Sequence, residues 1–280
     1  MKAIRSALLM GLFASAQAWA ANPPAEEVVF VSHGASLSGS IVIPGKQPIH
    51  AALVFIHGSG KQTRNVDLAQ RLASEGIAAL VYDKRGVGKS GGEYEGNQNV
   101  SGMNIALLAD DASAALEKLA SHPSLKGVPV GFAGISQAGW IAPLAAEKNR
   151  RAKFLLLWSG PVTKVSEEDI YSKYTADKES GVVPSYEQAL RARTQPYIWP
   201  DFLGKDTDPS DSLAKLSIPG LWVFSDNDGS IPVDLSIQRL NLVRRTRPAY
   251  GYVLFSGLGH DNIDGSFATT IAWLKKLPRN

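Results

Sequence analysis

The sequence has 280 residues, 44% hydrophobic and 20% charged, a composition typical of a globular chain with one large core. It contains no cysteine, which excludes disulfides, thiol catalysis and cysteine metal sites. The formal net charge is +3, and no basic cluster extends beyond Arg244, Arg245 and Arg247, so we expect no nucleic-acid partner.

The first twenty residues predict a signal peptide. Lys2 and Arg5 precede an apolar segment over residues 7–14, and Ala18-Trp19-Ala20 has small residues at the spacing of a signal-peptidase site. Cleavage after Ala20 leaves a mature domain over residues 21–280, periplasmic or secreted. The alternative is a membrane anchor, but this apolar segment is too short to span a bilayer, and no other stretch approaches 18 apolar residues. We therefore expect no membrane span after cleavage.

Apolar strands and amphipathic helices alternate along most of the mature chain. The first half predicts strands at 27–32 and 37–43 joined by a turn, a strand at 51–56, a helix at 67–74, a strand at 77–82, a helix at 104–120, a strand at 128–133 and a helix at 137–147. The second half predicts a strand at 154–158, a strand at 220–225, a helix at 233–243, a strand at 250–255 and a helix at 266–277. This alternation predicts an α/β fold with a mostly parallel central sheet flanked by helices.

The alternation stops between residues 159 and 216. This segment carries aromatic residues among charges and prolines, namely Tyr171, Tyr174, Tyr186, Tyr197, Trp199 and Phe202. A connection of this length in a compact domain needs structure of its own. We therefore expect a mainly helical cap insertion that lies over the strand ends.

The strand at 128–133 leads into Gly134-Ile135-Ser136-Gln137-Ala138-Gly139, which predicts a sharp strand-to-helix corner. At such a corner Ser136 takes a positive φ, so the residues two before and two after it must be small. Gly134 and Ala138 meet that condition, although the familiar pattern has glycine at both positions. The alternative is an ordinary turn in which Ser136 caps the helix, because short Gly-x-Ser patterns are common.

Two later loops carry an acid and a histidine. Asp228 follows the strand at 220–225 and His260 follows the strand at 250–255, so both leave the sheet at the same end as Ser136. A serine nucleophile needs a base within hydrogen-bond reach, and that imidazole needs a carboxylate to fix its tautomer. Asp226 is the alternative acid, although it lies nearer the strand.

At this point the chain resembles an α/β-hydrolase, and it is most similar to secreted or periplasmic esterases allied to the dienelactone hydrolase and prolyl oligopeptidase groups. The motifs extend from about residue 28 to the C-terminus. They are His57-Gly58-Ser59-Gly60, Tyr82-Asp83-Lys84-Arg85-Gly86-Val87-Gly88-Lys89-Ser90, the serine corner, Asp228 four residues before Pro232, and Gly259-His260. The resemblance implies an α/β-hydrolase fold with Ser136 as nucleophile, His260 as base and Asp228 as the orienting acid.

An oxyanion hole needs two main-chain donors. The amide of Gln137, at the first turn of the helix, is one candidate, and the resemblance implies Ser59 as the other. Trp140 beside the nucleophile and Trp199 in the cap are candidate substrate-binding residues, although the cap aromatics equally fit a cap core. No pair of histidines has metal-ligand spacing, so we expect neither a metal nor another cofactor.

These features together predict a secreted serine hydrolase that cleaves small-molecule carboxylic esters through an acyl-enzyme on Ser136. One alternative is a peptidase or amidase of the prolyl oligopeptidase-like group. The other is a non-catalytic binding protein that keeps the same fold.

Overall fold

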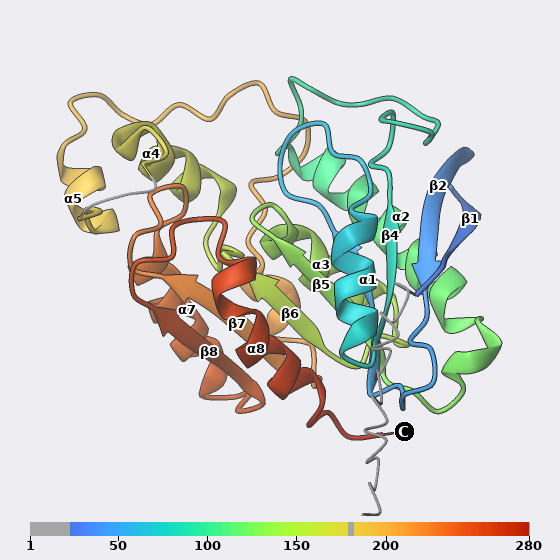
Figure 1. Cartoon of the computed structure of the whole chain (residues 1–280). Coiled ribbons are helices and arrows are strands. Elements are labelled where there is room, and N and C mark those ends of the chain that lie inside the picture. The colour runs from blue at the N-terminus through green and yellow to red at the C-terminus, as the bar shows by residue number, and fades with distance from the viewer. Residues whose placement is uncertain (1–22, 179–181, 280) are drawn as a thin grey trace, which may run out of the picture.

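The computed structural model describes residues 23–178 and 182–279, so the predicted signal peptide over residues 1–20 lies outside the described residues. The described strands are β1 (Ala25–Ser32), β2 (Ala35–Val42), β3 (Ala51–Ile56), β4 (Ile77–Tyr82), β5 (Val130–Ile135), β6 (Leu155–Trp158), β7 (Gly220–Ser225) and β8 (Tyr250–Phe255). They form one sheet in the order β1-β2-β4-β3-β5-β6-β7-β8 (Figure 1).

The sheet is antiparallel at one edge and parallel elsewhere. β1 pairs with β2 and β2 with β4 in antiparallel fashion, whereas every neighbouring pair from β4 to β8 is parallel. The carboxyl ends of β3 to β8 therefore lie at one edge, which we call the carboxyl edge. The predicted α/β fold with a mostly parallel sheet is confirmed.

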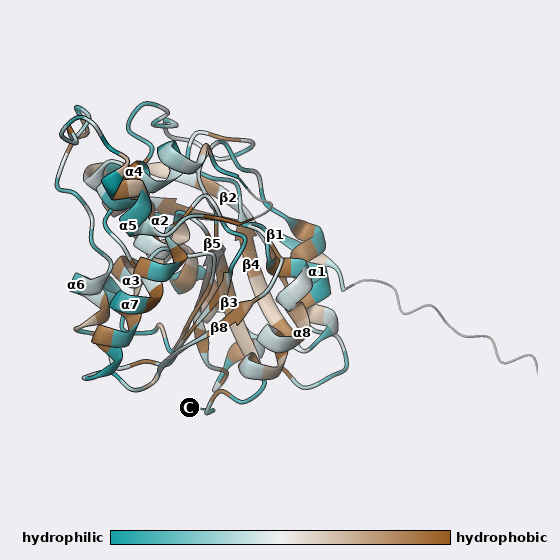
Figure 2. Cartoon of the chain, turned by 90° about the vertical axis from the view of Figure 1, so that its left-hand side faces the viewer, coloured by the Kyte–Doolittle hydropathy of each residue, from teal (hydrophilic) through white to brown (hydrophobic). Residues whose placement is uncertain are grey.

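Helices cover both faces of this sheet, as Figure 2 shows with the sheet seen nearly edge-on. One face carries α2 (Gly102–Ala120), α3 (Ala138–Lys148) and α7 (Val233–Arg244), and the other carries α1 (Val66–Ser74) and α8 (Ile263–Leu274). A short 3₁₀ turn, η1 (Pro123–Leu125), follows α2. The two helical layers explain why the central strands read as continuous apolar runs.

Neighbouring residues of one strand serve different cores. On β3, Leu53 belongs to the cluster beneath α1 and α8, while Val54 belongs to the cluster beneath α2 and α3. Both side chains are fully buried, because successive residues of a strand face opposite sides of the sheet. Burial of one such side chain stabilises the fold by ~1.5–3 kcal/mol.

Polar caps explain where two of the helices begin. The Asn65 side chain accepts a hydrogen bond from the Leu68 amide at 2.9 Å, and the Ser101 hydroxyl accepts one from the Asn104 amide at 3.2 Å. These bonds satisfy amides that the first helical turn leaves without a partner. α8 has no such side-chain cap at Asn262, and it begins three residues before the predicted start at residue 266.

The segment between β6 and β7 contains α4 (Val165–Thr175), α5 (Tyr186–Arg191) and α6 (Ser210–Leu213), joined by irregular chain within its described parts. α4 lies against the loop after β7, because the Thr175 hydroxyl donates to the carbonyl of Gly229 and the Tyr171 hydroxyl lies 3.5 Å from the carbonyl oxygen of Asp228. Figure 1 shows α4 and α5 at the end of the molecule beyond the sheet. Among the described residues, no helix has the length and apolar character needed to cross a membrane.

Arg85 and Asp111 tie the loop after β4 to α2. Arg85 Nε donates to Asp111 Oδ2 at 2.9 Å, and its Nη2 donates to the other carboxylate oxygen of Asp111 and to the carbonyl of Ser32. Arg85 is 6% exposed and Asp111 is fully buried. The preceding residue, Asp110, is partly exposed and pairs with Lys148 at 2.5 Å.

We predict that Asp111→Ala lowers the free energy of unfolding by about 3–5 kcal/mol, because the Arg85 guanidinium would stay buried without a carboxylate. Asp110→Ala is the matched control in the same helix, and its partly exposed pair predicts a loss below about 1 kcal/mol. Urea denaturation followed by circular dichroism measures both. Equal losses for the two variants would contradict the structural role of the buried pair.

Candidate active site

Ser136 lies at a strained corner between β5 and α3. Its φ is +56°, which confirms the backbone conformation predicted from the sequence. A Cβ atom at Gly134 would lie 2.5 Å from both the Ala138 Cβ and the Ile56 carbonyl oxygen, so only glycine fits there. The single methyl group of Ala138 is accommodated, and Ala138 is fully buried. Sterics therefore hold Ser136 at the carboxyl edge.

Asp228 and His260 meet at the same edge. His260 Nδ1 lies 2.9 Å and 3.0 Å from the two carboxylate oxygens of Asp228. Asp228 is fully buried, and its Oδ1 also accepts hydrogen bonds from the amides of Ser230 at 2.9 Å and Ile231 at 3.2 Å. In neutral His260, donation from Nδ1 to this carboxylate leaves Nε2 as the acceptor nitrogen.

Asp226 serves a different purpose. Its carboxylate accepts hydrogen bonds from the Ser256 hydroxyl at 2.6 Å and from the Gly257 amide at 2.8 Å. These bonds join the loop after β7 to the loop after β8, in which His260 lies. The structure thus separates the two aspartates, with Asp228 against the imidazole and Asp226 between the loops.

A second pair of residues holds the main chain of His260. The Ser159 hydroxyl donates to the His260 carbonyl at 2.7 Å, and Asn262 Nδ2 donates to the Ser159 hydroxyl oxygen at 3.0 Å. Both side chains are fully buried, and Ser159 has a φ of +44°. Sequence reasoning did not identify this pair, because nothing local to β6 indicates that its end meets the loop after β8.

Ser136 and His260 line one cavity of about 600 Å³. Ser59 and Gly58, from the loop after β3, line it as well. A Cβ on Gly58 would lie 3.5 Å from the Ser136 Cβ, so this loop lies directly against the serine corner. Three of the five predicted catalytic and oxyanion groups therefore line one cavity, namely Ser136, His260 and Ser59. Asp228 is buried against His260, and Gln137 follows Ser136 without lining the cavity.

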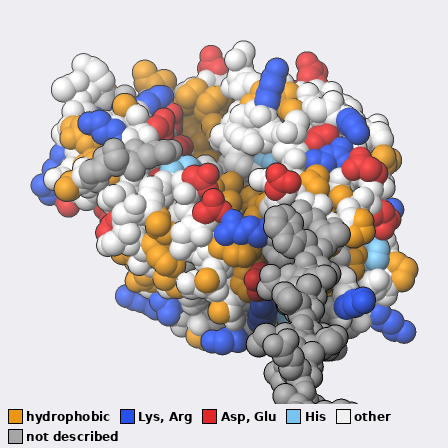
Figure 3. Space-filling model, in the orientation of Figure 1, with side chains coloured by type: hydrophobic (Ala, Val, Ile, Leu, Met, Phe, Trp, Pro, Cys, Tyr) orange, Lys and Arg blue, Asp and Glu red, His pale blue; other side chains and the backbone are white. Residues whose placement is uncertain are grey.

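The cavity is acidic. Glu168 on α4, Asp177 after α4 and Asp261 line it, and no lysine or arginine does so among the described residues. Figure 3 shows a histidine surface beside acidic side chains at a hollow on this face. Burial raises the pKa of Glu168 to about 8, with the negative charges of Asp169 and Asp177 acting in the same direction. Glu168 is therefore mostly protonated at neutral pH.

The main-chain amides of Ser59 and Gln137 are available as donors. Neither amide donates a hydrogen bond to another described residue. Gln137 precedes α3, where the first amides of a helix have no intrahelical partner. Its side chain is fully buried and donates from Nε2 to the carbonyl of Asn99 at 2.6 Å.

Lys84 is a buried cation that sequence reasoning did not single out. It is 3% exposed, and its Nζ donates to the Gly58 carbonyl at 2.9 Å, the Gly60 carbonyl at 3.2 Å and Gln137 Oε1 at 2.8 Å. Burial lowers the pKa of its ammonium group to about 8. The sequence feature that could have identified Lys84 is its position two residues after the end of β4, at the carboxyl edge.

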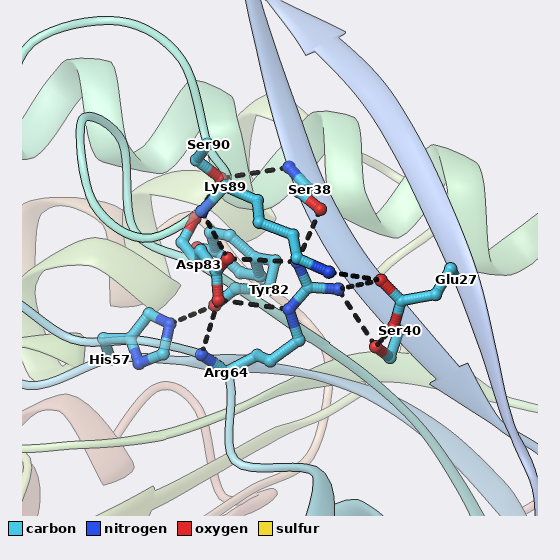
Figure 4. Close-up of polar contacts among 9 residues, drawn as sticks. All are labelled: Glu27, Ser38, Ser40, His57, Arg64, Tyr82, Asp83, Lys89 and Ser90. Atoms are coloured by element: carbon cyan, nitrogen blue, oxygen red, sulfur yellow. Dashed lines mark hydrogen bonds and ion pairs between the residues drawn. The ribbon is translucent and has the colours of Figure 1, made fainter.

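The residue before Lys84, Asp83, lies in a network of polar contacts, which Figure 4 shows. Asp83 accepts hydrogen bonds from the amide and the guanidinium of Arg64 and from the Lys89 amide. Burial alone would raise the pKa of Asp83, but these bonds outweigh it and lower the pKa to about 2. His57 Nε2 donates to the Tyr82 carbonyl, and burial lowers the His57 pKa to about 4, so the ring is neutral at pH 7.

The two candidate substrate-binding tryptophans lie elsewhere. Trp140 is 3% exposed, belongs to the hydrophobic core and donates from Nε1 to the Thr163 carbonyl at 2.7 Å. Trp199 packs against the same core, and its ring meets Phe202 edge-on at 5.3 Å. Neither lines the cavity of Ser136, so the assignment of Trp140 and Trp199 to substrate binding is not supported. Trp140 does not reach the cavity because it lies on the face of α3 that packs into the core.

Within residues 23–178 and 182–279, no three carboxylate or imidazole side chains converge in an arrangement that could hold a metal ion. The polar groups of the site instead bind one another or the main chain. The chemistry that these residues themselves support is acyl transfer to an activated serine.

Comparison with known proteins places residues 47–197 within the family described as serine aminopeptidase, S33. That segment contains Ser59, Lys84 and Ser136 but ends before Asp228 and His260. Over 136 residues, the chain is 35% identical to polyketide transferase claH of Penicillium crustosum and 32% identical to a putative phosphoribosyl transferase of Mycobacterium tuberculosis. The aligned segments cover 47% of this chain, but only 41% and 29% of those relatives.

Solved structures share the fold over almost the whole chain. An esterase of Pyrococcus furiosus superposes with a TM-score of 0.65 at 15% identity, covering 91% of this chain and 90% of that protein. An acylaminoacyl peptidase of Pyrococcus horikoshii superposes with a TM-score of 0.70 at 15% identity, covering 94% of this chain and 43% of that protein. At this identity the likeness concerns the fold alone.

Proposed function

This chain belongs to the serine aminopeptidase S33 family and has the α/β-hydrolase fold predicted from its motifs. We propose that it is a serine hydrolase that cleaves carboxylic esters through an acyl-enzyme on Ser136. The observation that carries the proposal is the meeting of Ser136 and His260 in one cavity, with His260 held by buried Asp228. The amides of Ser59, which lines that cavity, and of Gln137, which follows Ser136, donate no hydrogen bond to another described residue, and this supports the proposal further.

In this mechanism, Ser136 Oγ attacks the ester carbonyl while His260 Nε2 takes its proton. The resulting oxyanion accepts hydrogen bonds from the amides of Ser59 and Gln137, and loss of one such donor typically lowers the rate about 10²–10³-fold. Asp228 stabilises the imidazolium. His260 then protonates the departing alcohol, activates a water molecule for attack on the acyl-enzyme, and returns a proton to Ser136 as the carboxylic acid leaves.

Esters are the proposed substrates because an alcohol leaves more readily than an amine and so asks less of His260 as a general acid. The cavity of about 600 Å³ has room for a small acyl group and its alcohol. Its wall includes Phe55, Leu68, Ile135 and Ile263, which offer apolar contacts to both parts of such an ester.

Ser136→Ala should lower turnover of p-nitrophenyl acetate by at least about 10⁴-fold, because the nucleophile is lost. The same variant should no longer be labelled by a fluorophosphonate, and mass spectrometry of the wild-type adduct should locate the label on Ser136. Ser124→Ala is the control, since Ser124 is an exposed residue of η1 remote from the cavity. Unchanged turnover in Ser136→Ala would refute the assignment.

The acidic lining favours a second candidate, hydrolysis of amides or esters whose acyl part carries an amino group. The three carboxyl groups of Glu168, Asp177 and Asp261 line the cavity, and its described lining contains no lysine or arginine. A bound ammonium group would lower the pKa of Glu168 and so favour its ionised form. This arrangement supports a preference for cationic substrates, as a peptidase that acts at a free N-terminus requires.

For this candidate, alanyl p-nitroanilide should have a kcat/KM at least about 10-fold above that of propionyl p-nitroanilide, which lacks only the amino group. Glu168→Gln should reduce that ratio by about 5- to 10-fold at pH 8. Glu187→Gln, an exposed carboxylate on α5, is the matched control and should leave the ratio unchanged. Equal rates on both anilides in the wild-type protein would leave only the ester proposal.

The proposal includes export of the protein from the cytoplasm. Lys2 and Arg5, the apolar residues 7–14 and Ala18-Trp19-Ala20 support removal of residues 1–20 during secretion. In a Gram-negative host, the periplasmic protein should begin at Ala21 on N-terminal sequencing. Ala18→Arg should block this processing, and recovery of the wild-type chain from the cytoplasm with residues 1–20 intact would overturn the proposal.

A further inference from the structure

The Lys84 ammonium group bridges the two chain segments that carry the proposed oxyanion donors. Two of its three acceptors, the carbonyls of Gly58 and Gly60, flank Ser59, and the third is the side-chain oxygen of Gln137. The Lys84 amide also donates to the Gln62 carbonyl at 3.0 Å. One residue of the loop after β4 therefore anchors the whole loop after β3 and joins it to the start of α3.

The contact with Gly58 has a particular consequence for Ser59. The Gly58 carbonyl and the Ser59 amide belong to the same peptide unit, and in a trans peptide they point in opposite directions. A cation that holds the carbonyl therefore fixes the direction of the amide and, by polarising the peptide, makes it a stronger donor. Gly60, with a φ of +83°, gives this loop backbone freedom that needs such an anchor.

The positive charge of Lys84 is not neutralised by a neighbour. Among the described residues no carboxylate forms an ion pair with it, and the adjacent Asp83 is engaged by Arg64. The other titratable groups near it are His57, which is neutral at pH 7, and Tyr94, whose ring centre lies 6.0 Å from Nζ. Lys61 lies 5.6 Å from the same ring and adds positive charge.

We propose that Lys84 is a positioning residue for the oxyanion hole: its ammonium group sets the direction of the Ser59 amide, locks the Ser59 loop to Gln137, and leaves a positive charge near the developing oxyanion. This inference rests on the proposed serine hydrolase function. In this proposal Lys84 does not contact the substrate. It raises the rate by orienting the amide donors of Ser59 and Gln137.

The protonation state of Lys84 should then govern the rate. An ammonium group donates three hydrogen bonds, whereas a neutral amine donates two and presents a lone pair to the remaining acceptor. Because burial lowers the pKa of Lys84 to about 8, deprotonation loosens the bridge at moderately alkaline pH. The kcat/KM of the wild-type protein should therefore decline above about pH 8, since this ratio reports groups of the free enzyme.

The test compares Lys84→Met, which keeps an unbranched side chain but removes the ammonium group, with Lys89→Met at an exposed lysine of the same loop. On p-nitrophenyl acetate, Lys84→Met should lower kcat about 10- to 100-fold with KM changed less than about 3-fold. It should also slow fluorophosphonate labelling of Ser136 without preventing it, and lose the alkaline decline. Its Tm should fall only slightly, because the loss of three hydrogen bonds is offset by removal of a buried charge that has no carboxylate partner. Lys89→Met should behave as the wild type.

Each outcome decides the inference. A folded Lys84→Met protein with wild-type kcat, or with the same alkaline decline, would overturn it. If that variant does not fold, a wild-type kcat/KM that stays level from pH 8 to about pH 9.5 would overturn it instead. Lys84→Arg, whose charge does not titrate in this range, should recover part of the rate without the decline. Failure of the wild-type protein to react with the fluorophosphonate would instead refute the hydrolase function itself.

Discussion

Burial of the central strands on both faces is the constraint on which the rest of this structure depends. Helices cover each side of β3 to β7, so a charged side chain in the middle of these strands would be buried away from water. Polar and charged groups are instead placed where the strands end. Because the strands are parallel, their carboxyl ends meet at one edge, and Ser136, Asp228 and His260 follow three of them.

Three charged residues at this edge, Asp83, Lys84 and Asp228, are buried, and each is compensated in its own way. Asp228 binds His260 and two main-chain amides, and Asp83 binds Arg64. Among the described residues, the ammonium group of Lys84 donates hydrogen bonds to oxygen atoms of uncharged groups. The first two arrangements balance charge with opposite charge or with directed dipoles. The third leaves a net positive charge beside two amides that donate to no other described residue, a distribution suited to a site where negative charge develops.

The sequence was sufficient for the features that depend on local chemistry. The apolar runs predicted every strand from β3 to β8 within two residues at each end, and the small residues around Ser136 predicted its positive φ. It failed where a side chain's neighbours come from distant elements. Trp140 was assigned to substrate because it is near Ser136 in sequence, but the helical turn carries it into the core. No local pattern in the sequence identifies the role of Lys84, because its three hydrogen-bond acceptors come from other parts of the chain.

By itself the sequence determined the order of strands and helices, the serine corner and the acid and histidine at strand ends, because hydrophobic period and backbone sterics act over a few residues. Only the tertiary structure decided that Asp228 rather than Asp226 contacts His260, that acidic side chains from α4 and the loop after β8 face the cavity, and that Lys84 bridges two loops. Those relations depend on how the loops of separate strands converge in space, and no local pattern encodes that convergence.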